Sequence, residues 1–378
     1  MRTIVTGQIG MHKKPYLDAV ADLAGRRGGH IETFHIGNLM YAEAPDIRAG
    51  RILDLPLSRL NALRRAVFKD IIAQTAPASE HPNVIINTHA TFRWRHGLFS
   101  AFDFDQIQLF EPDMFICLVD NVETVHHRLH AEHDIDATLK DCMVWREEEI
   151  LATELLAQAV GRPHGFYILS RGRQRETIET CLRLITRPDI PKVYPSFPMS
   201  HVMDMPEILA KIDQFRAGLA EHFITFDPGD VDEKLLLERA IAASQQGQDW
   251  VEVEPHTFGA RTDDGPCIRV SVREVLDIAG DIDGQIYMRD FKLIDQSDMI
   301  CSYIPELPGG MPALSSGVER ELQHAFEHTK EVYIVWTPAK TPSPFITETA
   351  TKIFSSVEEA MGYFQKKGVM AQGDLFGN

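Results

Sequence analysis

Three side chains in the second half of the sequence have the chemistry to break a bond at a sugar carbon. They are Tyr194 in "KVYPSFPMS", Asp290 in "YMRDFKLIDQSDMICSYIPE" and Glu321 in "LSSGVERELQHAFEHTKEVYIVW". A glutamate held near an anomeric carbon can attack it and form a covalent glycosyl-enzyme, which water later resolves. We expect Asp290 to hold the sugar or assist proton transfer, and Tyr194 to fix the carboxylate of Glu321 by a hydrogen bond.

Helical spacing favours Glu321 over Glu319 as the nucleophile. In "ELQHAF", Leu322, Ala325 and Phe326 predict the packed face of the helix. That face puts Glu321 at its margin and turns Glu319 toward solvent. Glu321 is therefore the residue that can point into a cleft over the sheet.

The start of the same helix offers a place for a phosphate. Ser315 and Ser316 supply hydroxyls, and Gly317 and Val318 supply backbone amides at a helix N-terminus, which attracts anions. Each of these features also has an ordinary structural interpretation. A Ser-Ser-Gly is a common helix cap, an Asp is common in turns and caps, and a Tyr at a strand end is usually packing.

Together, these motifs resemble the nucleoside 2-deoxyribosyltransferase family, including its branch of 2′-deoxynucleoside 5′-phosphate N-hydrolases. The resemblance covers residues 190–365 and rests on the order and spacing of the three segments. It implies that Glu321 is the nucleophile, Asp290 the acidic partner and Tyr194 the tyrosine of the site. It also implies that no cofactor is required for the glycosidase reaction, and that the chain forms a homo-oligomer, because family members build their pocket between subunits.

One departure from that family's pattern concerns the substrate. Members that act on free nucleosides carry an Asp before the glycine, where this sequence has Ser315 and Ser316. A carboxylate would repel a phosphate, whereas hydroxyls and helix-start amides attract one. This favours a nucleotide over a nucleoside as substrate. The family's Gly after Glu-Leu is Gln323 here, and the preferred base does not follow from the sequence.

In the first half, "GQIGMHKK" is an altered phosphate-binding loop. A P-loop has the pattern GxxxxGK[ST] between a strand and a helix, and Gly7, Gly10 and Lys13 fit it. His12 stands where the glycine before the lysine is expected, and Lys14 replaces the hydroxyl that holds Mg²⁺. Lys13, Lys14 and the amides near Gly10 can still bind a phosphorylated ligand.

The segments "VIINTHATFRWRHGLF" and "PDMFICLVDNVETVHHRLHAEHD" extend this comparison. With the loop, they resemble archaeal-type adenylate kinases and related P-loop nucleotide kinases over residues 1–185. Thr88 and His89 match the family's Asp-Thr-His, but Asn87 replaces its Asp. Two changes around one metal argue against Mg²⁺ and against ordinary phosphoryl transfer. We therefore predict that this half binds a nucleotide such as ATP through the loop, Asn87 and His89; the alternative is a fold kept for dimerisation or packing.

Four histidines at helical spacing follow, namely His126, His127, His130 and His133. Such spacing presents imidazoles on one face of a helix, where a metal ion can bind. No cysteine or carboxylate accompanies them at a recognisable ligand spacing. We interpret them as a solvated helix and predict no metal site.

The elements that must position these residues alternate between strand and helix along the chain. This pattern predicts an α/β protein of two three-layer domains with mainly parallel sheets, the first P-loop kinase-like and the second Rossmann-like. We place the first domain at 1–186, a linker at 187–191 and the second domain at 192–366. The second domain contains an insertion at 231–285, and a flexible tail covers 367–378.

Composition narrows the class of protein. The chain has 378 residues, 44% of them hydrophobic, and no run of about 20 apolar residues that would span a membrane. The N-terminus has no secretory signal pattern, which indicates a cytoplasmic protein. The five cysteines are scattered, so neither a disulfide framework nor a zinc site is predicted. The net charge of -17 argues against a general nucleic-acid surface.

The segment "QGDLF", Gln372–Phe376, resembles the pentapeptide with which bacterial replication proteins dock into the sliding clamp. A Leu-Phe pair on a mobile end can anchor in an apolar pocket. We state clamp binding as a hypothesis.

The leading prediction is a nucleotide N-glycosidase or deoxyribosyltransferase with a nucleotide-binding domain that regulates it. Such a fusion would suit nucleotide depletion in antiviral defence. The alternatives are an active adenylate or nucleotide kinase, and a non-catalytic, nucleotide-responsive binding protein.

Overall fold

The structure is a computed structural model. It describes residues 1–48, 50–76, 83–94, 97–133, 135–172, 176–199, 202–253 and 267–371, without the side chains of Trp94 and Glu176. The predicted clamp-binding segment Gln372–Phe376 and most of the predicted tail lie outside these residues.

The chain forms two compact units that alternate along the sequence. The first unit contains residues 1–186 and 231–284, and the second contains residues 187–230 and 285–378. The sequence predicted that residues 231–285 are an insertion in the second domain. Their contacts instead group residues 231–284 with the first unit, because Glu233 forms a buried ion pair with Arg146 and one of their helices packs on the helix that contains Arg146, neither of which chain order shows.

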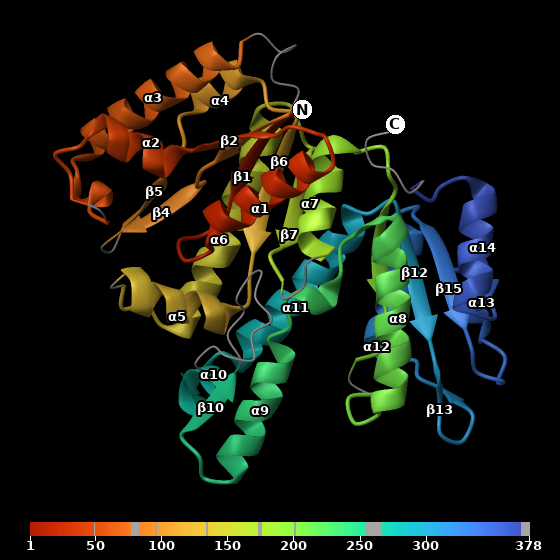
Figure 1. The fold of residues 1–378 in the computed structure, drawn as a ribbon. Coiled ribbons are helices and arrows are strands. Elements are labelled where there is room, and N and C mark those ends of the chain that lie inside the picture. The colour runs from red at the N-terminus through yellow and green to blue at the C-terminus, as the bar shows by residue number, and fades with distance from the viewer. Residues whose placement is uncertain are drawn as a thin grey trace. The chain divides into compact units, whose positions relative to one another are not determined.

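The first unit is built on a five-stranded sheet in the order β2-β3-β1-β6-β7, and every pairing in it is parallel (Figure 1). Its strands are β1 (Arg2–Thr6), β2 (Glu32–His35), β3 (Val84–Asn87), β6 (Met114–Val119) and β7 (Phe166–Ser170). β6 is buried at every residue, as expected for a central parallel strand. The loop "GQIGMHKK" follows β1, which lies between β3 and β6.

Helices connect these strands. They are α1 (Lys13–Arg26), α2 (Ile36–Glu43), α3 (Leu57–Gln74), α4 (Phe104–Phe110), α5 (Val122–His133), α6 (Leu139–Ala159) and α7 (Glu176–Thr186). An antiparallel hairpin, β4 (Thr91–Trp94) and β5 (Gly97–Ser100), leaves the end of β3. Thr138 caps α6 with a capping box to Asp141, which fixes where this helix begins.

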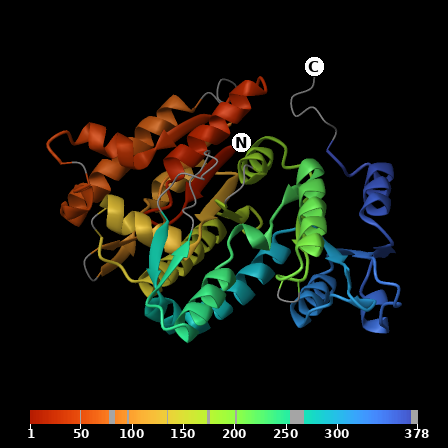
Figure 2. The same ribbon diagram turned by 60° about the horizontal axis from the view of Figure 1, so that its bottom comes forward.

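The returning segment adds a small subdomain to the first unit. It consists of α9 (Lys234–Gln245), the antiparallel strands β10 (Trp250–Val253) and β11 (Ile268–Ser271), and α10 (Val272–Asp277). In Figure 2 the teal hairpin lies beside α9. Val251, Val253, Ile268 and Val270 are buried at alternate positions, so one face of the hairpin packs inward.

The second unit contains another wholly parallel sheet, in the order β16-β15-β12-β8-β9. Its strands are β8 (Lys192–Ser196), β9 (Ile224–Thr225), β12 (Met299–Ile304), β15 (Glu331–Trp336) and β16 (Lys352–Phe354). Its helices are α8 (Pro206–His222), α11 (Ala279–Asp295), α12 (Ser316–Glu327), α13 (Pro344–Thr347) and α14 (Val357–Lys367). A short hairpin, β13 (Glu306–Leu307) and β14 (Met311–Pro312), precedes α12, and the boundary between the units falls within α11. The α/β class and the mainly parallel sheets are confirmed.

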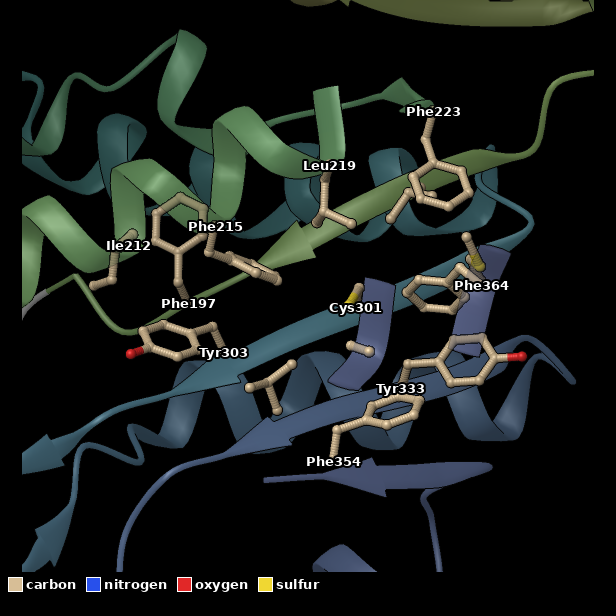
Figure 3. Packing of buried hydrophobic residues seen from close by; sticks show 14 of the residues in the cluster. Phe197, Ile212, Phe215, Leu219, Phe223, Cys301, Tyr303, Tyr333, Phe354 and Phe364 are labelled. Carbon is tan, nitrogen blue, oxygen red and sulfur yellow. The ribbon is translucent and has the colours of Figure 1, made fainter. Parts of the chain in front are cut away.

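An aromatic core fills one face of the second sheet (Figure 3). Phe215 of α8 stacks on Tyr303 of β12 with ring centroids 5.5 Å apart, and Phe223 meets Phe364 of α14 edge to face at 5.4 Å. These geometries suit the ring quadrupoles. This core holds β8 and β12 in register, and both strands lead to the candidate site on their other face.

In the second unit, one local expectation was wrong, and one structural alternative is excluded. Phe326 is 49% exposed, because the packed stripe of α12 runs through Val318, Leu322 and Ala325 and turns away from it. Asp290 lies within α11 and not in a turn or at a cap, since the helix continues through "YMRDFKLID" to its end.

Across the described residues, no helix is both long enough and apolar enough to cross a membrane.

Candidate functional site

The second sheet has a switch point between β8 and β12. The chain passes from β8 to β9 on one side of it and then to β12, β15 and β16 on the other, which is the 2-1-3-4-5 order of flavodoxin-like sheets. In open parallel sheets, ligands bind at the carboxyl ends of the strands at such a point. Tyr194 and Ser196 are at that end of β8, and Ser302 lies on β12 opposite Ser196.

Both carboxylate oxygens of Glu321 are held from β8. Tyr194 Oη donates to Oε1 at 2.9 Å, and Ser196 Oγ donates to Oε2 at 2.6 Å. Ser302 Oγ donates to Ser196 Oγ at 3.3 Å, which leaves the Ser196 proton for the carboxylate. Tyr194 and Ser196 share a face because strand side chains alternate. The predicted contact between Tyr194 and Glu321 is present.

Burial and neighbouring charges shift the pKa values of Glu321 and Tyr194. Burial raises the pKa of Glu321 to about 8, and the negative charge of Asp290 adds to the effect. Burial, then Asp290 and Glu321, raise the pKa of Tyr194 well above its usual value, so the phenol remains a donor. Asp290 and Glu321 are thus a carboxylate pair of the kind that retains a proton near neutral pH.

Two groups of the predicted phosphate site, the Ser315 hydroxyl and the Val318 amide, are bonded to each other as the cap of the helix. Ser315 is the N-cap of α12, and its Oγ accepts from the amide of Val318 at 3.2 Å. The Val318 side chain is buried. The amides of Ser316 and Gly317 come first in the helix, where no preceding turn supplies acceptors. Ser316 and Gly317 are both exposed.

Ser196 and Ser302 were missed from the sequence. The signal for Ser196 was its position two residues after Tyr194 in a strand, which puts both side chains on one face. Ser302 had no such signal, because its role depends on the register between β8 and β12.

In the first unit, three residues of the altered loop have positive φ angles. Gly7 has φ 145° and Gly10 has φ 84°, and His12 has φ 50° and ψ 41°, in the left-handed region. A Cβ on Gly7 would lie 2.9 Å from the carbonyl oxygen of Leu118. His12 thus adopts a conformation that favours glycine, at the position where a glycine was expected.

Lys13 is turned into this loop. It is buried, and Nζ donates to the carbonyl oxygen of Gly7 at 2.5 Å and lies 3.2 Å from Nδ1 of His89. Burial lowers the pKa of Lys13 to about 8, while Glu149 opposes that shift. Burial and then Lys13 lower the pKa of His89 well below its usual value, so the imidazole is neutral and accepts from the ammonium.

Glu149 braces the loop from α6. Its carboxylate accepts from the amide of Gly7 at 3.0 Å and from the amides of Ala90 and Thr91 at 2.8 Å each. These bonds tie the end of β1 to the end of β3. This role could not be predicted, because Glu149 is one of three consecutive glutamates with no local pattern to distinguish it.

Lys14 and Asn87 take part in a separate chain of contacts. Lys14 Nζ pairs with Asp18 at 2.6 Å, and Asp18 also lies 3.2 Å from Nε2 of His35. Asn87 Nδ2 donates to Nδ1 of His35 at 2.9 Å. His12 pairs with Glu132 on α5 at 2.6 Å. Lys14 is exposed and paired along its own helix, at the edge of the cavity described next.

A cavity of about 880 Å³ opens beside the loop. All seven predicted loop-side residues except Gly7 line it: Gly10, His12, Lys13, Lys14, Asn87 and His89. Arg64 of α3 also lines it and is 2% exposed. Its Nη1 donates to Asn61 at 3.0 Å, and among the described residues Nη2 has no hydrogen-bond partner.

Arg64 was not predicted, although its position was informative. It lies on the apolar stripe of α3 with Leu60, Phe68 and Ile71. Burial lowers the pKa of Arg64 to about 10, and its guanidinium lies 5.9 Å from the centre of the Phe92 ring. A buried cation with a spare donor in a cavity is suited to an anionic ligand.

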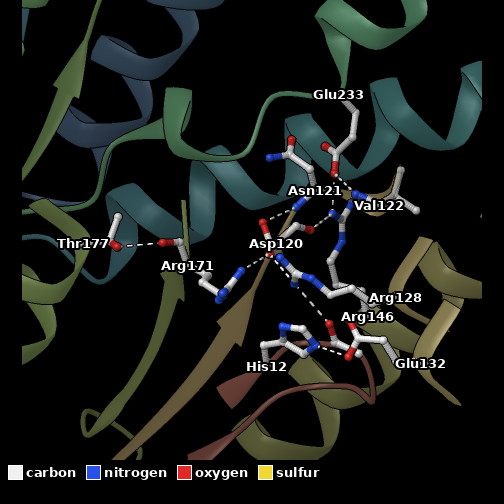
Figure 4. A network of polar contacts seen from close by, with 11 residues as sticks. His12, Asp120, Asn121, Val122, Arg128, Glu132, Arg146, Arg171, Thr177 and Glu233 are labelled. Atoms are coloured by element: carbon white, nitrogen blue, oxygen red, sulfur yellow. Dashed lines mark hydrogen bonds and ion pairs between the residues drawn. The ribbon is translucent and has the colours of Figure 1, made fainter. Parts of the chain in front are cut away.

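A buried ion network supports the loop from the other side (Figure 4). Asp120, after β6, accepts from Arg128 at 2.9 Å and from Arg171 at 3.1 Å, and Arg128 also donates to the carbonyl oxygen of Gly10 at 3.1 Å. Arg146 donates to the Asp120 carbonyl at 3.1 Å and to Glu233 at 2.5 Å. Glu233 comes from the returning segment, which the network ties to the loop.

The four histidines at helical spacing, His126, His127, His130 and His133, are not grouped as metal ligands among the described residues. On α5, the Nε2 atoms of His126 and His130 lie 3.1 Å apart, and His130 also contacts the carbonyl oxygen of Ala137. Within the described ranges, side chains grouped as metal ligands occur elsewhere, at Asp295, His324 and His328.

One protein family and two solved structures that are similar to this chain each match less than half of it. Residues 19–141 match the family described as an AAA domain, starting inside α1 just after the loop. No curated protein matches the sequence. Among solved structures, a 2-deoxyribosyltransferase from Bacillus psychrosaccharolyticus is 15% identical, covering 46% of this chain and 91% of its own, with a TM-score of 0.26. A shikimate kinase from Bacteroides thetaiotaomicron is 13% identical, covering 49% of this chain and 95% of its own, with a TM-score of 0.31. The N-terminal region is thus similar to an AAA domain of the P-loop class.

Proposed function

We propose that the second unit cleaves the N-glycosidic bond of a nucleotide or deoxynucleotide, with Glu321 as the nucleophile. The observation that carries this proposal is that Tyr194 and Ser196 hold the two oxygens of Glu321 at the switch point of the sheet. A carboxylate fixed in this way has one orientation for attack, and its donors stabilise the charged form. The resemblance to the deoxyribosyltransferase family supports the same assignment.

The reaction has two steps. Glu321 attacks C1′ to form an ester, and the C1′–N bond breaks with its electron pair leaving on the base. Asp290 and Glu321 share one proton, and the reactive form is the one in which Asp290 holds it and Glu321 is ionised; Asp290 then delivers this proton to the departing base. In the second step water attacks C1′, Asp290 takes back a proton, and Glu321 is released with a sugar phosphate as product. If a second base replaced the water, the products would be those of a deoxyribosyltransferase.

The substrate's phosphate would bind at the start of α12. Ser316 and Gly317 are exposed there, and their amides point out of the first turn. This helix also carries Glu321, so a phosphate held at its N-terminus would place the sugar next to the nucleophile. The arrangement favours a 5′-phosphorylated substrate.

The test is release of free base from a panel of ribo- and deoxyribonucleoside mono- and triphosphates, followed by chromatography. The wild type should release base, Glu321→Gln should release none above background, and the matched variant Glu319→Gln should behave as the wild type. Mass analysis of the denatured protein should find a sugar phosphate on the peptide that contains Glu321. If the folded wild type releases no base from any member of the panel, the proposal is wrong.

A second function is favoured for the first unit, namely binding of a nucleotide such as ATP that regulates the second. Arg64, Lys13 and the left-handed loop all border one cavity, which supports a phosphorylated ligand. Asn87 donates to His35 in place of the aspartate expected to help hold Mg²⁺, which favours binding over phosphoryl transfer. ATP should raise the melting temperature without being consumed. ATP-dependent phosphorylation of AMP or a deoxynucleotide that is lost in Lys13→Ala would instead establish a nucleotide kinase.

A further inference from the structure

Three side chains that could bind a metal ion lie at the ends of the two helices that carry Asp290 and Glu321. His324 and His328 are four residues apart at the end of α12, and Asp295 is the last residue of α11. One ligand atom from each of the three lies within 4.8 Å of the others. Two histidines at i and i+4 present their rings on the same face of a helix.

The two rings are oriented by their neighbours. His328 Nδ1 donates to the carbonyl oxygen of His324 at 2.8 Å, because a carbonyl can only accept. In the neutral ring this leaves the lone pair of Nε2 available. A backbone carbonyl bound to the second nitrogen is the usual support for a histidine that ligates a metal.

His324 is fixed more strongly. Its ring stacks on Phe291 with centroids 4.4 Å apart, and its Nε2 lies 2.7 Å from Oδ1 of Asp295. Lys330 Nζ donates to the carbonyl oxygens of Asp295 and Ser297 at 2.7 and 2.6 Å, which anchors the backbone at the end of α11. The carboxylate of Asp295 therefore already faces the imidazole, with its main chain held in place.

We propose that Asp295, His324 and His328 bind a Zn²⁺ ion. Two imidazoles and one carboxylate are a common zinc donor set, and water would complete the tetrahedron. Ligand atoms about 2 Å from the ion lie roughly 3.4 Å from one another. The widest separation, up to 4.8 Å, must shorten, while His324 Nε2 and Asp295 Oδ1, now 2.7 Å apart, must move slightly apart. Rotation of the exposed Asp295 and His328 side chains allows both changes. Binding replaces the contact between His324 Nε2 and Asp295 Oδ1, because both atoms would then face the ion.

The ion would join the two helices that carry the carboxylates of the candidate site. Asp290 lies on α11, five residues before Asp295, and Glu321 lies on α12, three residues before His324. A bond from the end of α11 to the end of α12 would limit their movement relative to each other. The proposed role is stabilisation of this helix pair, and it holds whether or not the second unit is a glycosidase.

The experiment is a Zn²⁺ titration of the full-length protein, freed of metal by a chelator, against a chromogenic competitor. The wild type should bind one more equivalent than His328→Ala, and Asp295→Asn should bind that equivalent at least about tenfold more weakly. His222→Ala, at the end of α8 in the same unit, is the matched control and should bind as the wild type. The difference between variants removes any contribution from other histidines and from Cys267.

Two further measurements make the result decisive. Co²⁺ should give the visible d–d bands of a tetrahedral site in the wild type, and these should be absent in His328→Ala. Zn²⁺ should raise the melting temperature of the wild type but not of that variant, whereas metal-free melting should be the same for both. Equal Zn²⁺ stoichiometry and affinity in the wild type, His328→Ala and Asp295→Asn would overturn the proposal.

Discussion

Tyr194 and Glu321 are 127 residues apart in the sequence, yet the phenol of Tyr194 donates a 2.9 Å hydrogen bond to Oε1 of Glu321. The bond joins the first strand of the second sheet to the helix after its third strand. It therefore forms only when the parallel pairing of β8 with β12 is in register. Ser196 Oγ holds the other oxygen, so the carboxylate has two independent supports.

Tyr194→Phe tests the first of these supports. It keeps the ring in the core but removes the donor, which destabilises the ionised form of Glu321. We expect the rate of base release to fall by about 10- to 100-fold, and the acidic limb of the pH–rate profile to move to higher pH. Tyr303→Phe, on the neighbouring strand β12, is the control and should change neither. A Tyr194→Phe enzyme with the wild-type profile would show that the bond has no part in catalysis.

The raised pKa of Glu321 predicts a pH dependence of stability. Between about pH 4.5 and 8, folded Glu321 binds more protons than it does in the unfolded chain, so the free energy of unfolding falls as pH rises and levels off above pH 8. Glu321→Gln removes this dependence. Each pKa unit corresponds to about 1.4 kcal/mol, so Glu321→Gln should be more stable than the wild type by a few kcal/mol at pH 9, but not at pH 5.

Urea unfolding at pH 5 and pH 9 measures this difference. The exposed Glu319→Gln on the same helix should keep the wild-type slope. A difference between Glu321→Gln and the wild type that is constant with pH, or that grows toward low pH, would contradict the prediction.

The buried pair of Arg146 and Glu233 predicts a large cost for single substitutions in the first unit. Both side chains are almost completely buried, so removing one leaves an uncompensated charge. Arg146→Met or Glu233→Leu should each lower the free energy of unfolding by about 3–5 kcal/mol, and the double variant should cost less than the sum. The exposed pair of Lys140 and Asp281 is the contrast, and Lys140→Ala should cost under about 1 kcal/mol. If substitutions in the buried and the exposed pair lowered the free energy of unfolding by similar amounts, burial would not determine the contribution of these pairs to stability.

Arg64→Met separates a binding role from a structural one. If the guanidinium serves an anionic ligand, the variant should bind ATP about 10- to 100-fold more weakly. The ligand-free protein should be as stable as the wild type or more stable, because a buried charge with a spare donor is costly. Arg65→Met changes the next residue, which is paired with Asp103 on the surface, and should keep ATP affinity. If Arg64→Met lost stability but bound ATP as tightly as the wild type, the role of Arg64 would be structural.

Local patterns in the sequence were enough to predict most elements of the two sheets. The stretch "LSRLNALRRAVFKDIIAQ" predicted α3, and "EVYIVW" predicted β15, because their apolar spacing differs in period. The hydrogen bond between Tyr194 and Glu321 was predicted from their motifs. Arg64 was not predicted, because the sequence does not show that this part of α3 lines a cavity.

Long-range features did not follow from local patterns. The contact of Ser302 with Ser196 depends on strand register, and the bracing of Gly7 by Glu149 joins residues 142 positions apart. Glu233 lies in a segment whose helical pattern was visible, but nothing in the pattern says which unit it pairs with. Its partner, Arg146, is buried in α6, and a helical pattern does not show which distant residue pairs with it.

The alternation of the two units along the chain has a consequence for synthesis. The ribosome releases residues 1–186, then the first two strands of the second sheet, and only afterwards Glu233, which neutralises Arg146. The first unit cannot complete its structure until residues 231–284 are synthesised, and the second cannot do so until residues 285–378 are synthesised. Such late, non-local closure slows folding and prolongs the exposure of unpaired strand edges. If residues 1–186 were expressed alone, Arg146 would be buried without Glu233, its partner. A truncated protein that contains the first unit must therefore include residues 231–284.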